Sequence, residues 1–545
     1  MTETAEILNE YFASVFTVED VSCIPNAKKE FKGDLDLEGL NNLDIDEDLV
    51  LRKLSELNTS KTPGPDSLHP KMIYELRLEL SKPFTTLFKL SVCSGYIPQD
   101  WKEGIVSPLF KKGSKTKPEN YRPVSLTSII GKILESIIKD HIVNHLSSYQ
   151  LIHNSQHGFT RGRSCLTNLL EFMEGVTGEL DSGNSLDLVY LDFAKAFDKV
   201  PCIRPSKKLE AHGISGSVSQ WIKNWLSGRR QRVSINGVYS VWREVTSGVP
   251  QGSVLCPILF IVYINDLDNG LLSKLGKFAD DTKMYKSVNN PEDAEILRKD
   301  LNKLDEWSKD WQMQFNIDKC VVMHMGRGNE QNEYMLGNKK LRESNRERDL
   351  GIIVDSNCKF SEQCREVVKS ANRTLGMIKR NITYKSKDVI VRLYKALVRP
   401  KLEYCVQAWR PYLKRDIDNL EKVQHRASKM INECRFLNYE DRLVRAGLVT
   451  LEDRRTKGDM VEVFKIINGI DNLDCHKFFS IASTSRTRGH KHKLLKSRSR
   501  IDIRKHSFSQ RVVNKWNELP EVVVDAKSVN CFKNRYDKFV REKTK

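Results

Sequence analysis

Two spacings of apolar residues alternate along the chain, one typical of strands and the other of amphipathic helices. Runs rich in β-branched and aromatic residues predict strands over 104–110, 186–193, 229–237, 274–285 and 319–325. Apolar residues three or four positions apart predict helices over 128–146, 258–272 and 292–312. We therefore expect a mixed α/β unit between residues 90 and 330, and helices alone over 361–436.

The first 90 residues have a helical pattern that is interrupted twice. Residues 30–50 form an acidic link with eight acids and one lysine. Residues 61–70, KTPGPDSLHP, are a turn-forming stretch, and Asp66 or Ser67 is the predicted N-cap of the helix that follows.

Charge and size point to a large basic protein. The 545 residues carry a net charge of +18, which favours a polyanionic partner such as nucleic acid, although solubility alone also explains it. Residues 486–500 hold seven Lys or Arg and no acid, which suits RNA binding, a disordered tail or a localisation signal. The longest apolar run, 257–264, is much shorter than the roughly 20 residues of a membrane span, and no signal peptide is present, so we expect no membrane.

The cysteines do not suggest a metal site or a disulfide framework. There are twelve of them, scattered and without a CxxC pair. The group formed by Cys475, His476, His490 and His492 is too irregular to indicate zinc. We expect free thiols in a reducing compartment.

Two adjacent carboxylates, Asp280 and Asp281, interrupt the apolar run 274–285. Like charges this close repel each other, and a bound cation removes that cost. Asp192 ends the predicted buried strand over 188–191. If the two strands are neighbours, the three carboxylates converge and suit two Mg²⁺ ions roughly 3.5–4 Å apart, an arrangement for phosphoryl transfer. On spacing alone, acidic turns without any metal are equally common.

The sequence motifs around these acids resemble those of a known family. The motifs are, in order, PGPDSLHP (63–70), NYRPVSL (120–126), QHGFTRGRS (156–164), LDFAKAFDKV (191–200), SGVPQGSVLCPILF (247–260), KFADDTKMY (277–285) and FNIDKC (315–320). Together they resemble the reverse transcriptases of non-LTR retrotransposons, especially the jockey-like branch. The resemblance extends from residue 12 to residue 529.

The resemblance implies an α+β fold of the right-hand polymerase type. Residues 1–90 would be an N-terminal helical extension of the fingers, and 91–355 the fingers and a palm with an antiparallel sheet. Residues 356–440 would be a mainly helical thumb, and 441–545 a basic C-terminal region.

The resemblance also assigns roles to single residues. Asp192, Asp280 and Asp281 would bind two Mg²⁺ ions, with Mn²⁺ as a substitute, and Lys319 would be a general acid. The implied nucleotide-binding residues are Lys111, Arg122, Phe193, Phe197, Gln251 and Gly252, and the implied nucleic-acid contacts are Gln156, Arg161 and Arg163. Phe197 would be the gate that excludes a ribose 2′-OH. Simpler explanations stay open: a core aromatic for Phe197, Lys112 in place of Lys111, a strand-edge lysine for Lys319 and a solvated loop for the arginines.

The predicted function is RNA-directed DNA synthesis. The implied partners are an RNA template, a DNA primer, dNTPs and the element RNA, in a ribonucleoprotein of the nucleus and cytoplasm. Relatives usually have His where Cys202 stands and a leucine-rich helix start where Arg204, Pro205 and Ser206 stand, and the chain begins too close to the polymerase motifs for an endonuclease domain. These departures favour an alternative, a catalytically silent, truncated copy that only binds nucleic acid. An intron maturase is a nearer alternative, against which the segment WNELP (516–520) argues.

Overall fold

A computed structural model describes residues 1–34, 39–482 and 490–544. Its central sheet has the strand order β12-β9-β3-β8-β7, in which every neighbouring pair except β12 and β9 is antiparallel. The strands are β3 (Leu186–Leu191), β7 (Lys274–Phe278), β8 (Asp281–Ser287), β9 (Val321–Met325) and β12 (Arg342–Glu343). The register pairs Leu191 with Thr282, so β3 ends at the edge of the sheet where β8 begins.

A second sheet lies in the N-terminal part of the chain. Its order is β2-β1-β4-β5, with β6 also paired to β4, and β1 and β4 are parallel. The strands are β1 (Glu103–Phe110), β2 (Tyr121–Leu126), β4 (Arg229–Ile235), β5 (Val238–Tyr239) and β6 (Arg243–Val245). Helix α1 (Thr2–Ser14) packs on this sheet, and its Leu8 and Phe12 form a small core with Val106 and Val233.

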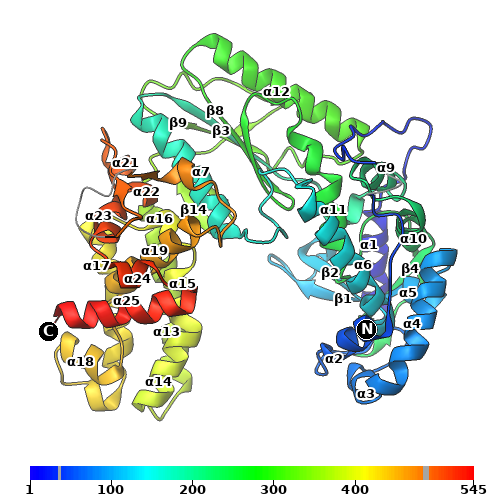
Figure 1. The fold of residues 1–545 in the computed structure, drawn as a ribbon, viewed down its shortest axis with the longest axis horizontal. Coiled ribbons are helices and arrows are strands. Elements are labelled where there is room, and N and C mark those ends of the chain that lie inside the picture. Colours follow the sequence, from blue (N-terminus) through cyan, green and yellow to red (C-terminus); the bar gives the residue numbers. More distant parts are fainter. Residues whose placement is uncertain (35–38, 483–489, 545) are drawn as a thin grey trace.

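Helices surround both sheets. Those before β3 are α2 (Glu47–Ser55), α3 (Pro70–Glu75), α4 (Arg77–Ser94), α5 (Gln99–Lys102), α6 (Ile129–Ser148) and α7 (Cys165–Asp181). Those between the strands are α8 (Ala196–Lys199), α9 (Arg204–Ala211), α10 (Gly216–Leu226), α11 (Cys256–Tyr263) and α12 (Pro291–Asp310). Figure 1 shows α12 and the central sheet at the top, with α1 to α6 and α9 to α11 on one side.

The C-terminal third is mainly helical and lies on the other side in Figure 1, together with α7. The hairpin of β10 (Met335–Leu336) and β11 (Lys339–Lys340) packs on α12, and Leu336 belongs to the core of the N-terminal helices. Two more two-stranded pairs are β13 (Arg346–Asp349) with β14 (Ile352–Asp355), and β15 (Ser480–Ile481) with β16 (Leu494–Leu495). Its helices are α13 (Ser361–Asn381), α14 (Lys387–Leu393), α15 (Arg399–Glu403), α16 (Val406–Trp409), α17 (Lys414–Lys429), α18 (Tyr439–Ala446), α19 (Leu451–Ile467), α20 (Cys475–Phe478), α21 (Asp502–Lys505), α22 (Phe508–Arg511), α23 (Val513–Asn517), α24 (Glu521–Val524) and α25 (Val529–Thr544).

The two faces of β3 are buried in different hydrophobic cores. Val189 and Leu191 join the core that contains the N-terminal helices, whereas Leu186 and Leu188 join the core of the C-terminal helices. Successive side chains of a strand point to opposite faces, so one strand contributes to both cores. A strand buried on both faces has the continuous apolar run that is seen here.

Most elements predicted from the sequence are confirmed, and some boundaries are corrected. The run 274–285 forms two strands joined by a turn, and the helix expected over 258–272 ends at Tyr263, after which Asn265–Asp268 form a 3₁₀ helix. The N-cap before α3 is His69, whose Nδ1 accepts the N–H of Lys71, so the prediction of Asp66 or Ser67 is wrong. The acidic link and the basic tract extend partly outside the described residues, at 35–38 and 486–489.

The unusual segment at 202–206 has a structural explanation. Pro205 lies in the first turn of α9, where a missing N–H leaves no helical bond unmade. Arg204 is 3% exposed, and its guanidinium lies 3.1 Å from the carboxylate of Glu19 in the N-terminal segment.

All twelve cysteines lie in the described residues and are free thiols, as predicted. No helix in the described part of the chain is long and apolar enough to cross a membrane.

Candidate active site

Three carboxylates meet at one end of the central sheet. Strands β7 and β8 form a tight hairpin in which Phe278 pairs with Asp281, and Ala279 and Asp280 form the tip. Ala279 has φ of +52°, a left-handed conformation that turns the chain at this point. Asp192 directly follows β3, whose last residue pairs with the neighbour of Asp281. The convergence predicted from the sequence is therefore a property of the sheet register.

The carboxylates at the hairpin tip influence one another electrostatically. Burial, and to a smaller extent the charge of Asp192, raise the pKa of Asp280. Burial raises the pKa of Asp281 to about 6, with further contributions from the charges of Asp280, Asp349 and Asp192. The neighbouring charges are the part of this cause that a bound cation would offset.

The donor types at this edge fit a hard divalent cation, because carboxylate oxygens are the ligands that Mg²⁺ prefers. The arrangement of the side chains is that of an ion pair: Lys319 Nζ lies 2.6 Å from Asp192 Oδ2. Within the described residues, no group of three His, Cys, Asp or Glu side chains is placed so that it could hold a metal ion. The three aspartate side chains would therefore have to move relative to one another to hold an ion together.

The backbone around Asp192 is held by the segment that carries Lys319. The N–H of Asn316 donates to the carbonyl of Asp192 at 2.7 Å, and the N–H of Asp192 contacts Cys320 Sγ at 3.4 Å. Phe193 is 3% exposed and its ring stacks on Phe315, with 4.5 Å between centroids. The structure thus places the Phe193 side chain in the core, and not on the nucleotide-binding surface that the sequence predicts.

Basic side chains face the carboxylates from the second sheet. Arg122 is exposed on β2, and Lys111 follows β1, with its N–H bonded to the carbonyl of Asn120 at 2.8 Å. Burial lowers the pKa of Lys111, and the positive charges of Arg122 and Lys319 act in the same direction, whereas Asp192 opposes them. Lys111, Arg122 and Lys319 therefore form a positive rim within electrostatic range of Asp192.

The glycine-containing turn at 247–252 is fastened to the segment after Asp192. The carbonyl of Phe197 accepts the N–H of Val249 at 2.8 Å, and the carbonyl of Gln251 accepts the N–H of Ser125 at 2.7 Å. Gly252 has φ of +130°, and a Cβ there would lie 2.3 Å from the carbonyl oxygen of Ser125. A side chain at this position would have to displace β2, which explains the glycine.

Two consecutive residues of the motif at 191–200, Phe197 and Asp198, contact α11 and the turn at 247–252. The half-buried ring of Phe197 packs on Phe260, with 4.5 Å between centroids. Asp198 Oδ1 accepts a hydrogen bond from Gln251 Nε2 at 2.9 Å. Sequence reasoning did not single out Asp198, and the signal that could have found it is a lone acid directly after the predicted gate residue.

The three residues predicted to contact nucleic acid have different surroundings. Gln156 is fully buried, and its Oε1 accepts the N–H of Ala279 at 3.0 Å, so it holds the hairpin tip and lies away from the predicted nucleic-acid surface. Arg163 donates from Nη2 to Asn154 Oδ1 at 2.9 Å and braces its own loop. Arg161 is exposed, as a nucleic-acid contact requires.

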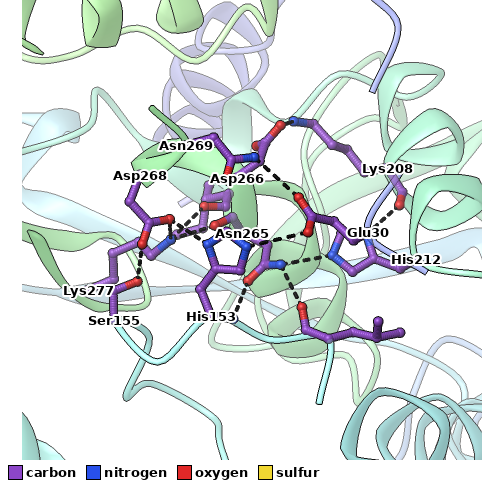
Figure 2. A network of polar contacts seen from close by, with 12 residues as sticks. Glu30, His153, Ser155, Lys208, His212, Asn265, Asp266, Asp268, Asn269 and Lys277 are labelled. Atoms are coloured by element: carbon purple, nitrogen blue, oxygen red, sulfur yellow. Dashed lines mark hydrogen bonds and ion pairs between the residues drawn. The ribbon is translucent and has the colours of Figure 1, made fainter. Parts of the chain in front are cut away.

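A buried polar network contacts β7 of the hairpin, and no motif in the sequence predicted it (Figure 2). Lys277 of β7 is fully buried, and its Nζ donates to the carbonyl of Asn265 at 2.7 Å and to Asp268 Oδ1 at 3.0 Å. His153 Nδ1 lies 2.8 Å from the same carboxylate, and its Nε2 lies 3.6 Å from Glu30. The network connects β7 to the N-terminal segment.

Comparison with known proteins gives a family match and a group of relatives. The family model "Reverse transcriptase (RNA-dependent DNA polymerase)" matches residues 110–369. The chain is 26% identical over 391 residues to a probable RNA-directed DNA polymerase from transposon X-element of Drosophila melanogaster. The matched segment covers 70% of this chain and 43% of that protein. It is 24% identical over 402 residues to the RNA-directed DNA polymerase from mobile element jockey of the same species, covering 70% and 43%.

A third relative is the retrovirus-related Pol polyprotein from type-1 retrotransposable element R1 of Bradysia coprophila. It is 24% identical over 461 residues, covering 79% of this chain and 44% of that protein. The matched segments span less than half of the length of each of these three relatives.

Proposed function

We propose that this chain, whose residues 110–369 match the reverse transcriptase family model, is an RNA-directed DNA polymerase of a non-LTR retrotransposon. The observation that carries the proposal is the convergence of Asp192, Asp280 and Asp281 at one sheet edge, opposite the positive rim of Lys111, Arg122 and Lys319. Nucleotidyl transfer requires carboxylates that bind metal ions and basic side chains that bind phosphate. The reaction would join a dNTP to a primer 3′-OH on an RNA template.

The proposed architecture is the right hand of polymerases. The central antiparallel sheet would be the palm, and the second sheet with the helices of residues 1–90 would belong to the fingers. Residues 91–355 would complete fingers and palm, 356–440 would be the helical thumb, and 441–545 the basic C-terminal region. The antiparallel strands around Asp192 and the helical composition after β14 support this division.

The cofactor in this proposal is Mg²⁺, two ions, with Mn²⁺ as a substitute, held by Asp192, Asp280 and Asp281. When bound, it would lower the pKa of the attacking hydroxyl and neutralise the leaving pyrophosphate. The protein's own part is to keep the three carboxylates together. The sheet register and the buried Gln156 do this, because Gln156 bonds directly to the tip of the hairpin.

The remaining residues act on the nucleotide. Arg122 and Lys111 would bind the triphosphate, Arg as a bidentate donor and Lys as a point charge. Phe197 would occupy the space of a 2′-OH, and the turn at Gln251 and Gly252 would contact the nucleotide from the other side. Lys319 would carry a proton to the leaving pyrophosphate once it has separated from Asp192.

The nucleic acids would lie on basic surfaces. The net charge of +18 and the exposed Arg161 suit an RNA template and a DNA primer that are bound through their phosphates. In the cell, the protein would form a ribonucleoprotein with the element RNA and would occur in the nucleus and the cytoplasm. The catalytically silent alternative gains no support from relatives whose names describe RNA-directed DNA polymerases.

Primer extension tests the proposal. The purified chain, an RNA template with an annealed DNA primer, four dNTPs and Mg²⁺ should give extended DNA, and chelation of the metal should stop it. Extension on RNA that continues without any divalent cation would contradict the two-metal mechanism. Tight binding of the duplex by a folded protein that never extends it would favour the silent alternative.

A further inference from the structure

The C-terminal third contains a cavity that the proposed mechanism does not use. Its lining residues come from segment 410–417, from α19 and from segment 506–515, where α19 packs against α16, α17 and α23 (Figure 1). Its volume is about 260 Å³, whereas one water needs roughly 10–15 Å³ of such space, so a larger group fits. The basic side chains that line this basic cavity are Arg410, Arg455, Arg511 and Lys515.

Two of these arginines share one buried carboxylate and form the frame of the basic cavity. Arg410 Nη1 donates to Asp459 Oδ2 at 2.7 Å, and Arg511 Nη2 donates to Asp459 Oδ1 at 2.8 Å. Arg511 Nη2 also donates to the carbonyl of Gln407 at 2.7 Å. These contacts hold α19 to the segments on both sides of it, so the two guanidinium groups have a structural role.

Arg455 of α19 has no such partner. It is 2% exposed, and within the described residues its Nε and Nη2 have no hydrogen-bond acceptor. Burial lowers the pKa of Arg455, and the positive charge of Arg410 acts in the same direction. A bound anion would oppose both effects. Because buried donors in native proteins are nearly always paired, this guanidinium at the wall of a cavity indicates an acceptor that comes from outside the chain.

The balance of charge indicates what kind of anion fits. Lys515 is exposed on α23, forms no ion pair in the described part of the chain, and its Nζ lies 3.4 Å from Thr456 Oγ1. Among the described lining residues the carboxylates are Asp459 and Glu452, so the cations exceed them by two. A phosphate monoester carries roughly −1.5 to −2 charges at pH 7, and a phosphodiester carries a single charge. The excess therefore matches a monoester.

We propose that the basic cavity binds a phosphate monoester, with Arg455 and Lys515 as donors to its oxygens. Arg suits this role because its guanidinium can donate two parallel hydrogen bonds to a phosphate. A small phosphorylated molecule and the phosphorylated 5′ end of a nucleic-acid strand present the same group, and the test distinguishes them. The site goes beyond the proposed function, since none of its lining residues belongs to the candidate active site.

Calorimetric titration of the full chain tests the proposal with phenyl phosphate, a monoester, and methyl phenyl phosphate, the matching diester. The unaltered chain should bind the monoester at least about tenfold more tightly than the diester. Arg455→Met should weaken monoester binding by at least about tenfold, the contribution of one charge-assisted hydrogen bond. Equal affinity of the unaltered chain and Arg455→Met for phenyl phosphate would overturn the proposal. If Arg455→Met does not fold, as circular dichroism would show, the same loss or its absence in the exposed variant Lys515→Met decides the question.

Arg454→Met is the matched control. Arg454 is the preceding residue of α19, does not line the basic cavity, and donates from Nη2 to Glu403 Oε2 at 2.8 Å. Its loss should leave the affinity for phenyl phosphate unchanged. Binding that persists in Arg455→Met and disappears in Arg122→Met would place the phosphate at the candidate active site and overturn the proposal.

Two oligoribonucleotides of one sequence, with a 5′-phosphate or a 5′-hydroxyl, identify the source of the group. Tighter binding of the phosphorylated strand, with the advantage lost in Arg455→Met, would assign the site to a nucleic-acid end. Equal binding of both strands, with phenyl phosphate still bound, would assign it to a small phosphorylated molecule. Failure of primer extension would leave this inference standing, because the basic cavity has no part in the proposed mechanism.

Discussion

Lys319 and Asp192 form an ion pair, 2.6 Å from Nζ to Oδ2, at the sheet edge where the other two aspartates turn. The pair puts a protein cation on a carboxylate that the proposed mechanism assigns to a metal. Lys319 is 60% exposed and Asp192 is 37% exposed, so solvent screens their attraction and the pair can exchange its partner. Lys319 and Mg²⁺ would compete for the same oxygen.

The first prediction follows from this competition. Lys319→Ala should lower the Mg²⁺ concentration for half-maximal extension by at most about fivefold, because an exposed ion pair contributes no more than about 1 kcal/mol. The maximal rate should fall if Lys319 also supplies a proton. Metal titrations of primer extension measure both effects. Lys339→Ala, which removes a lysine from another exposed aspartate, is the control, and a raised Mg²⁺ requirement in Lys319→Ala would contradict the competition.

The second prediction concerns sugar selection. Phe197→Val removes the ring that would clash with a 2′-OH, so ribonucleotide incorporation relative to deoxynucleotide should rise by about tenfold or more. Single-nucleotide extension with UTP and dTTP measures the ratio. Phe193→Leu is the matched control, since this ring is buried against Phe315 and its loss should cost stability without changing the ratio. Equal shifts in the two variants would exclude a gate at Phe197.

The third prediction concerns the fully buried Lys277. Lys277→Met removes the ammonium that pairs with Asp268 and that donates to the carbonyls of Ile264 and Asn265, so the free energy of unfolding should fall by about 3–5 kcal/mol. Urea denaturation measures it. Lys274→Met, on the same strand but 62% exposed, should change stability by no more than about 0.5 kcal/mol. Similar losses for both lysines would contradict the assigned role of the network.

The fourth prediction is a pH dependence of stability. The hydrogen bond to Asp268 raises the pKa of His153 above its ordinary value of 6.5, despite burial. A base whose pKa is raised by folding stabilises the folded state fully below the unfolded pKa, and this contribution is lost as pH rises through the folded pKa. Urea midpoints should therefore fall from pH 6 upward in the unaltered chain. His153→Gln should remove this part of the slope, and an unchanged slope would rule out His153 as its source.

The sequence could indicate a convergence of the three acids because each of them ends or interrupts an apolar run, whereas the pairing of the two runs is visible only in the folded chain. Asp192 ends a buried apolar run, and the acids at the tip interrupt another run, so antiparallel pairing of the two brings all three to one edge. Apolar runs also predicted β1, β3, β4, β7, β8 and β9, whereas β2, β5, β6 and β12 were not predicted. The predicted helix over 258–272 extends beyond the end of α11 at Tyr263, after which the carbonyls of Ile264 and Asn265 accept hydrogen bonds from the Lys277 side chain.

Three predicted site residues have surroundings that the motifs could not show, and the physical cause is the same for each. A motif shows which residues occur together and does not show which of them are buried. Gln156 is a buried support of the hairpin, Phe193 is a core ring, and Arg163 braces its own loop. Asp198 escaped notice for the opposite reason, since only the folded chain brings it to Gln251.

The most direct test of the central claim is extension by Asp280→Ala beside a matched acid. Asp318→Ala removes a 78% exposed carboxylate next to Lys319 and should extend an RNA-templated primer as the unaltered chain does. Asp280→Ala should keep its fold and its affinity for the duplex and lose extension by at least about a thousandfold. Extension by Asp280→Ala at the rate of Asp318→Ala would contradict the claim that the paired acids at the hairpin tip are the catalytic site.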